Sequence, residues 1–107
     1  MNDKPTAAEP FNGLTPEQDE CLTVLSEECA ELIVAIAKVQ RHGLLSYDPR
    51  NGQQNYVTLQ REMGDVLAAA RLAETYTLLD WGRVLKARNH KLIELPEWLH
   101  HAKVAHE

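Results

Sequence analysis

The chain has 107 residues, a length that suits one domain of ordinary size. Hydrophobic residues make up 44% of it and charged residues 25%, a balance that is typical of globular proteins and excludes a disordered chain. The net charge of -5 argues against a protein that binds nucleic-acid polymers, because binding to the phosphate backbone needs clustered Lys and Arg.

No segment has the features that would direct the chain into a membrane. The N-terminal residues lack the order of charged, apolar and small residues found in a signal peptide. No run approaches the ~20 apolar residues of a membrane-spanning helix. We therefore expect a cytoplasmic protein with no membrane partner.

The N-terminal part of the chain predicts an irregular arm followed by a long helix. Residues 1–13 contain two prolines and show no hydrophobic periodicity. Thr15 can cap a helix, Pro16 suits its first position, and Gln18 completes a capping box. The helical pattern then runs to His42, where the following glycine is a typical stop signal.

Turn signals separate this helix from a second one. Residues 42–55 contain the pairs Asp48-Pro49 and Asn51-Gly52, both typical of turns, and they predict a loop. Apolar residues at helical spacing predict a second long helix from about Tyr56 to Thr77.

The C-terminal part predicts shorter helices. A third helix is expected from Asp80 to about Ile93, and Pro96 either ends that segment or opens a final short helix. The predicted fold class is all-α, with two long antiparallel helices and two short ones in a single domain over residues 14–107.

The first helix carries acids beside its apolar face. At about 100° per residue, one stripe of this helix is apolar and is expected to face the core; its members are Leu22, Leu25, Cys29, Leu32, Ile33 and Ile36. Glu28 and Glu31 lie on an adjacent strip, and Glu27 lies further round, toward solvent.

The second helix places an acid within its buried face. That face is defined by Leu59, Val66, Ala69 and Ala73. Glu62 falls inside this arc, and Asp65 flanks it on the same side. A lone carboxylate there would lose hydration worth several kcal/mol unless it is paired or bound to a metal.

Antiparallel packing of the two helices would bring these two pairs of acids together. Carboxylates that share one site need a cation or raised pKa values. A ligand set made of oxygens favours a hard cation such as Mg²⁺ or Mn²⁺. The alternative from the residues alone is that Glu28 and Glu31 pair with Lys or Arg on the surface.

Two short motifs give the chain a family resemblance. "EECAE" at 27–31 and "EMGD" at 62–65 resemble the E-E-x-x-E and E-x-x-D signature of the MazG-like, all-α nucleoside triphosphate pyrophosphohydrolases. The similarity runs from about Leu22 to Lys91, and the interval between the motifs suggests an enlarged loop. The resemblance implies Mg²⁺-dependent hydrolysis of a nucleoside triphosphate to the monophosphate and pyrophosphate.

The resemblance also implies roles for single residues. It makes Glu28, Glu31, Glu62 and Asp65 the metal ligands, and Glu27 a catalytic residue that helps to orient a metal or the attacking water. As a carboxylate that is not a ligand, Glu27 could also take the proton of that water. "NHK" matches an Asn-x-Lys element that contacts phosphates, which implicates Asn89 and Lys91. The arginine that often follows one turn later is missing, since position 95 is Leu.

The width of the apolar faces predicts self-association. The apolar arcs of both long helices exceed about 100°, which is too wide for a single partner helix each. We expect a homodimer or homotetramer that completes a four-helix core, and the resemblance points the same way.

Two other functions compete with hydrolysis. One is a non-catalytic helical interaction module whose acids bind a basic partner. The other is a di-iron protein, because "EWLH" at 97–100 has the E-x-x-H spacing of di-iron ligands; only one copy of it exists.

Overall fold

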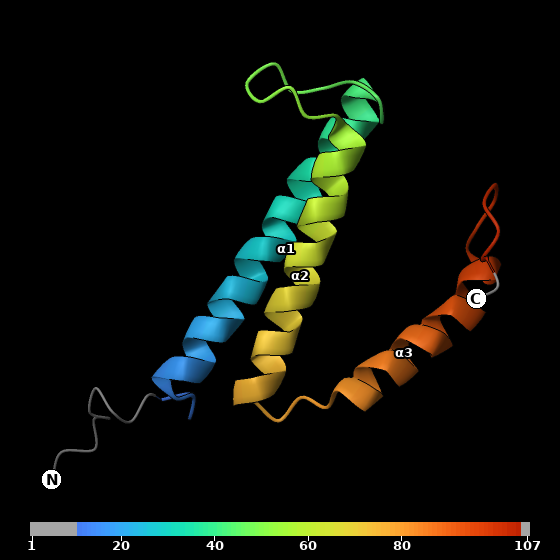
Figure 1. The fold of residues 1–107 in the computed structure, drawn as a ribbon. Helices are drawn as coiled ribbons and strands as arrows, with labels where there is room; N and C mark the ends of the chain where they lie inside the picture. The colour runs from blue at the N-terminus through green and yellow to red at the C-terminus, as the bar shows by residue number, and fades with distance from the viewer. Residues whose placement is uncertain (1–10, 106–107) are drawn as a thin grey trace, which may run out of the picture. The chain divides into compact units, whose positions relative to one another are not determined.

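The computed structural model describes residues 11–105, and its regular elements within this range are helical (Figure 1). The elements are α1 (Pro16–His42), α2 (Asn55–Tyr76), α3 (Trp81–Glu94) and a short 3-10 helix, η1 (Leu95–Glu97). The predicted all-α class is therefore confirmed. Most of the predicted N-terminal arm, residues 1–10, lies outside the described range. No helix in the described part is both long enough and apolar enough to cross a bilayer.

The chain divides into two compact units, one ending at Thr77 and the other beginning at Leu78. In the first unit, α1 and α2 run antiparallel and lie side by side along their length (Figure 1). The second unit consists of α3, η1 and the residues that follow.

The predicted start and end of α1 are confirmed. The Thr15 Oγ1 atom accepts a hydrogen bond from the Gln18 backbone N–H at 3.1 Å, and the Gln18 Oε1 atom accepts one from the Thr15 N–H at 3.0 Å. The helix ends at His42, and the residue that caps it, Gly43, has a φ of 92° that glycine adopts at little cost. Local capping chemistry thus sets both ends of α1.

The loop between the two helices caps α2. No side chain caps this helix at Gln54, and its first N–H groups instead bond to loop carbonyls. The Asn55 N–H donates to the Ser46 oxygen at 2.8 Å, and the buried Asn55 side chain donates to the Gly43 oxygen at 3.1 Å. The loop is therefore attached to the end of the hairpin by bonds to both helices.

One carboxylate organises the loop. Asp48 accepts hydrogen bonds from the Arg50 guanidinium, the shortest from Nη2 at 2.7 Å, and from the Arg50 backbone N–H at 2.8 Å. The Lys38 Nζ atom on α1 lies 3.8 Å from the same carboxylate. These hydrogen bonds from Arg50, together with the charges of Arg50 and Lys38, hold the pKa of Asp48 well below its ordinary value of 3.8.

This arrangement predicts a pH-dependent contribution to stability. Because the pKa of Asp48 is lowered in the folded state, its interactions stabilise the fold above pH 3.8 and are lost progressively as the pH falls through the lowered pKa. Asp48→Asn should lower the melting temperature at pH 7, and the difference from the unmodified protein should shrink at about pH 3. Arg50→Gln should show the same trend. A difference between Asp48→Asn and the unmodified protein that is as large at pH 3 as at pH 7 would contradict this assignment.

The predicted core stripe of α1 is partly wrong. Ile33 is 66% exposed, Ile36 is 41% exposed, and Cys29 is exposed as well. The buried residues of α1 are Cys21 and Ala35, which lie on a neighbouring strip of the helix. The helix α2 packs against α1 and covers this strip of small side chains, and the larger apolar side chains of α1 remain outside.

The predicted buried face of α2 is confirmed. Ala73 is fully buried, Ala69 is 4% exposed, and Glu62 is 8% exposed. The acid therefore shares with these alanines the buried face of α2, which packs against α1.

In the second unit, Asp80 caps α3 by accepting hydrogen bonds from the N–H groups of Gly82 at 2.8 Å and Arg83 at 3.3 Å. The helix ends at Glu94, one residue beyond the predicted end. Pro96 lies in η1, so the predicted final helix is reduced to a single 3-10 turn.

Candidate metal centre

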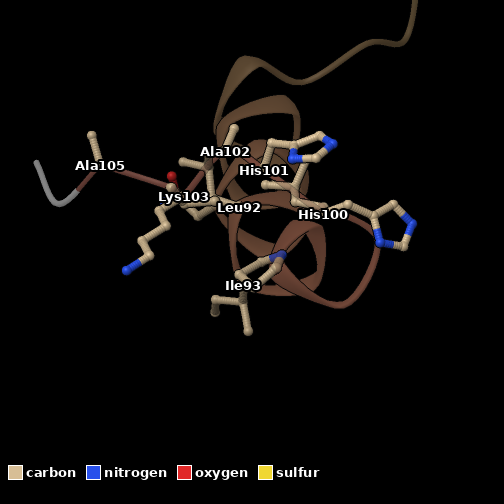
Figure 2. Close-up of a pocket in the computed structure, with 11 residues that line it drawn as sticks. Leu92, Ile93, His100, His101, Ala102, Lys103 and Ala105 are labelled. Atoms are coloured by element: carbon tan, nitrogen blue, oxygen red, sulfur yellow. The ribbon is translucent and has the colours of Figure 1, made fainter.

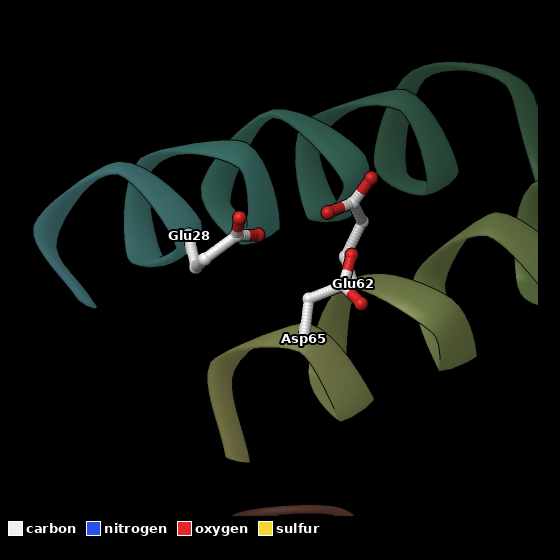
Figure 3. Close-up of side chains that lie close together, drawn as sticks. All are labelled: Glu28, Glu62 and Asp65. Atoms are coloured by element: carbon white, nitrogen blue, oxygen red, sulfur yellow. The ribbon is translucent and has the colours of Figure 1, made fainter. Parts of the chain in front are cut away.

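The α1–α2 hairpin gathers three of the four predicted metal ligands. Glu28 from α1 and Glu62 and Asp65 from α2 each place one carboxylate oxygen within 4.8 Å of the other two (Figure 3). Glu62 and Asp65 are about one helical turn apart on α2, so both side chains extend from the side of α2 that faces α1. The packing of two helices thus creates the cluster from residues that are far apart in the sequence.

Within the described part of the chain, two oxygens of this cluster are buried without a hydrogen-bond partner. The Glu62 Oε1 atom accepts a hydrogen bond from the Arg61 Nη2 atom at 3.2 Å. The Oε2 atoms of Glu62 and Glu28 are buried and have no hydrogen-bond partner among the described residues. A buried charged oxygen without a partner costs free energy, and a cation between the two helices would remove that cost. The donor set, which is made of carboxylates, suits Mg²⁺ or Mn²⁺.

The electrostatics of Glu28 agree with a cation-binding role. Burial raises the pKa of the Glu28 carboxyl above its ordinary value of 4.5, and the negative charges of Glu31, Asp65 and Glu62 raise it further. A side-chain hydrogen bond with Glu31 acts in the same direction. A divalent cation bound among these groups would favour the ionised form and oppose all of these effects.

The other two acids of the first motif do not belong to the group of three carboxylates. Glu31 interacts with Glu28 but is exposed, and it does not belong to the group of three. Glu27 is also exposed on α1. Glu31 nevertheless lines a pocket together with Glu62, so its carboxylate is within reach of the same region.

Asn89 and Lys91 lie on α3 in the second unit. The Asn89 Oδ1 atom accepts hydrogen bonds from the Arg88 guanidinium at 2.8 and 3.1 Å. The Lys91 Nζ atom lies 3.6 Å from the Glu94 Oε2 atom, and the side chain is 63% exposed. These contacts of both side chains are therefore with other residues of α3.

One pocket lies in the second unit. It has a volume of about 870 Å³ and is lined by Asn89 and by residues around η1 and the C-terminal segment (Figure 2). No carboxylate lines it within the range that the structure describes, so it lacks the acidic ligands that Mg²⁺ prefers. Glu97 and His100, the residues of the E-x-x-H motif, belong to no group of three possible ligands in residues 11–105, which leaves the di-iron hypothesis without support.

Sequence reasoning missed Arg61, Lys38 and Arg50. Arg61 directly precedes Glu62 and donates a hydrogen bond to its carboxylate. The position of a basic residue next to a buried acid could have indicated this contact from the sequence. Lys38 and Arg50 meet at Asp48 only because the loop folds back on α1, and no local pattern announces that contact.

Comparison with known proteins agrees with the geometry. A family model described as the MazG nucleotide pyrophosphohydrolase domain matches residues 17–100. The match includes both acidic motifs, the whole of α2 and the whole of α3. The comparisons with curated proteins and with solved structures gave no match. The family match extends over most of the chain, and the chain therefore belongs to the MazG nucleotide pyrophosphohydrolase domain family.

Proposed function

We propose that this chain hydrolyses a nucleoside triphosphate to the monophosphate and pyrophosphate, using Mg²⁺ or Mn²⁺. The metal ligands in this proposal are Glu28, Glu31, Glu62 and Asp65. The observation that carries it is the pair of buried carboxylate oxygens of Glu28 and Glu62 that face the space between the helices without a partner among the described residues. Membership of the family supports nucleotide pyrophosphohydrolase chemistry at this site.

In this proposal, some residues bind the metal and Glu27 transfers a proton. A divalent cation, when bound, neutralises phosphate charge and makes an attacking water more acidic. Arg61 fixes the orientation of the Glu62 carboxylate through its hydrogen bond to Oε1. Glu27 is exposed and lies next to the ligands in sequence, so its carboxylate is available to take the proton of the attacking water.

The non-catalytic interaction module is less consistent with the site. A basic partner would pair with exposed carboxylates, whereas Glu62 is 8% exposed and lies on the packed face of α2. The two functions differ in thermal stabilisation. A hydrolase should be stabilised by Mg²⁺ together with a slowly hydrolysed nucleotide analogue, because ligands that bind only the folded state raise its stability. A module that binds a basic partner should show no such shift, and that result would favour it.

We also propose that Asn89 and Lys91 contact the phosphates. Lys91→Ala should raise KM by about tenfold and change kcat little, because a contact to phosphate oxygens is present in both the ground state and the transition state. Asn89→Ala should act in the same direction but less strongly, since the amide carries no charge. Steady-state kinetics at saturating Mg²⁺ test this, and unchanged KM and kcat in Lys91→Ala would leave Lys91 as a surface cation paired with Glu94.

The substrate can be identified with a panel of canonical and modified ribo- and deoxyribonucleoside triphosphates. Release of pyrophosphate and release of orthophosphate are measured for each in the presence of Mg²⁺. The proposal requires pyrophosphate release from at least one of them, and orthophosphate as the direct product would contradict it.

A further inference from the structure

A second pocket adjoins the acidic cluster within the first unit. It has a volume of about 330 Å³ and lies between α1, the loop and the N-terminal half of α2. Glu31 and Glu62 belong to its lining, so the pocket continues from the candidate metal centre. Its volume is at the low end of the range for small-ligand pockets, which runs from about 300 to 1,000 Å³, so it suits a part of a nucleotide.

Helical spacing explains why these side chains share one pocket. On α1, Glu31 and Lys38 are two turns apart on the same side of the helix, with Ala35 one turn from Glu31. On α2, Asn55, Thr58 and Glu62 follow the same pattern. The pocket is therefore a groove between two helix faces, closed at one end by the loop.

At the loop end of the groove, the basic residues Lys38 and Arg50 share one carboxylate, that of Asp48. Asp48 is the carboxylate that both Arg50 and Lys38 approach, at 2.7 and 3.8 Å. The Arg50 guanidinium donates three hydrogen bonds to the two oxygens of Asp48, so the more distant Lys38 interacts with this carboxylate more weakly. Arg61 is held between Glu62 and the Gln53 Oε1 atom, each at 3.2 Å, and it lines the same groove. Lys38 and Arg61 thus present positive charge beside a candidate metal centre.

The lining favours phosphate over a nucleobase. No aromatic ring lines the groove in the described part of the chain, so stacking with a base has no platform there. Lys and Arg donate charge-assisted hydrogen bonds and accept none, which matches the oxygens of phosphate. Glu62 is 8% exposed and lines the groove, and its Oε2 atom has no hydrogen-bond partner among the described residues, although Oε1 is bonded to Arg61. A carboxylate oxygen in this state favours a cation at the end of the groove, and such a cation would also attract phosphate oxygens.

We propose that this groove is a phosphate-chain subsite, in which Lys38 and Arg61 hold the phosphoryl groups at the end of the triphosphate remote from the nucleoside. The inference rests on the proposed function, which supplies the triphosphate and the metal. Arg50 acts here as a positioning residue, because its bonds to Asp48 keep the loop closed over the groove.

Inorganic tripolyphosphate is the probe that tests this subsite, because it carries the phosphate chain without a nucleoside. Its binding to the full chain is measured by calorimetry at saturating Mg²⁺. The unmodified protein should bind it, and Lys38→Met and Arg61→Gln should each weaken binding by about tenfold or more. Arg71→Gln is the matched control, since Arg71 also lies on α2 and pairs with Glu74 outside the groove; its binding should be unchanged.

Metal binding must be measured separately, because Arg61 also holds Glu62. Mn²⁺ binding in the absence of any phosphate should be unchanged in Lys38→Met. Arg61→Lys, which keeps the positive charge, should restore part of the tripolyphosphate affinity lost in Arg61→Gln. Circular dichroism verifies that each variant is folded. If one of the two variants fails to fold, the other still tests the subsite.

Two results would overturn the inference. One is the absence of tripolyphosphate binding to the unmodified protein with Mg²⁺. The other is binding by folded Lys38→Met and Arg61→Gln that is as tight as in the unmodified protein. If nucleotides are still hydrolysed in either case, the subsite fails and the proposed function stands. If tripolyphosphate binds through Lys38 and Arg61 but no nucleotide is hydrolysed, the proposed function fails and the groove remains an anion site.

Discussion

Glu62→Gln is expected to reduce nucleotide hydrolysis by at least about 100-fold while the protein stays folded. Loss of a residue that only supports a metal ligand already costs about 10–100-fold, and Glu62 is proposed as a ligand itself. The substitution keeps the shape of the side chain and removes a charge that is 8% exposed and has one unpartnered oxygen within the described residues. The metal-free variant should therefore melt at the same temperature as the unmodified protein or higher.

Three measurements on the same preparation test this prediction: pyrophosphate release, Mn²⁺ affinity, and the melting temperature without metal. Glu74→Gln is the matched control, because Glu74 lies on α2 and pairs with Arg71 away from the cluster. The control should keep its activity. A folded Glu62→Gln variant with near-normal turnover would exclude this cluster as the metal centre.

Ile33→Glu is expected to break an oligomer into monomers and to lower the stability of the fold. We propose that the chain forms a homodimer or homotetramer because large apolar side chains remain outside the hairpin. Ile33 is 66% exposed, Leu67 is 59% exposed, and Met63 is 53% exposed. Burial of one such side chain is worth about 1.5–3 kcal/mol, so the two copies of Ile33 in a dimer would contribute about 3–6 kcal/mol.

Analytical ultracentrifugation at micromolar concentration measures this directly. The unmodified protein should sediment as a multiple of 12.1 kDa, and Ile33→Glu should sediment as the monomer with a lower melting temperature. Thr23→Glu adds the same charge at an exposed polar position of α1 and should change neither property. An unmodified protein that is a monodisperse 12.1 kDa monomer would refute the oligomer.

The ends of the helices were predictable because they depend on local chemistry. The capping box of Thr15 and Gln18 and the glycine at position 43 act within a few residues, and α1 begins and ends where they predict. The gathering of Glu28, Glu62 and Asp65 was also predictable, since helical spacing fixes which acids share a face and antiparallel packing brings the faces together.

The face of α1 that packs against α2 was not predictable from periodicity. Periodicity identifies a wide apolar arc, but it does not say which part of that arc meets which partner. The short side chain of Ala35 lies where the two helices meet, and the larger Ile33 and Ile36 lie outside. The contact of Lys38 and Arg50 with Asp48 was missed for a similar reason, because the loop brings these residues together and no local sequence pattern encodes its fold.

Product analysis of one nucleoside triphosphate tests the central claim most directly. The unmodified protein is incubated with a substrate from the panel, once with Mg²⁺ and once with a chelator, and the products are separated by anion exchange. Our account predicts equal amounts of nucleoside monophosphate and pyrophosphate with Mg²⁺, and no turnover with the chelator. Nucleoside diphosphate and orthophosphate as the products, or the same turnover in the presence of the chelator, would contradict a carboxylate-held metal centre that releases pyrophosphate.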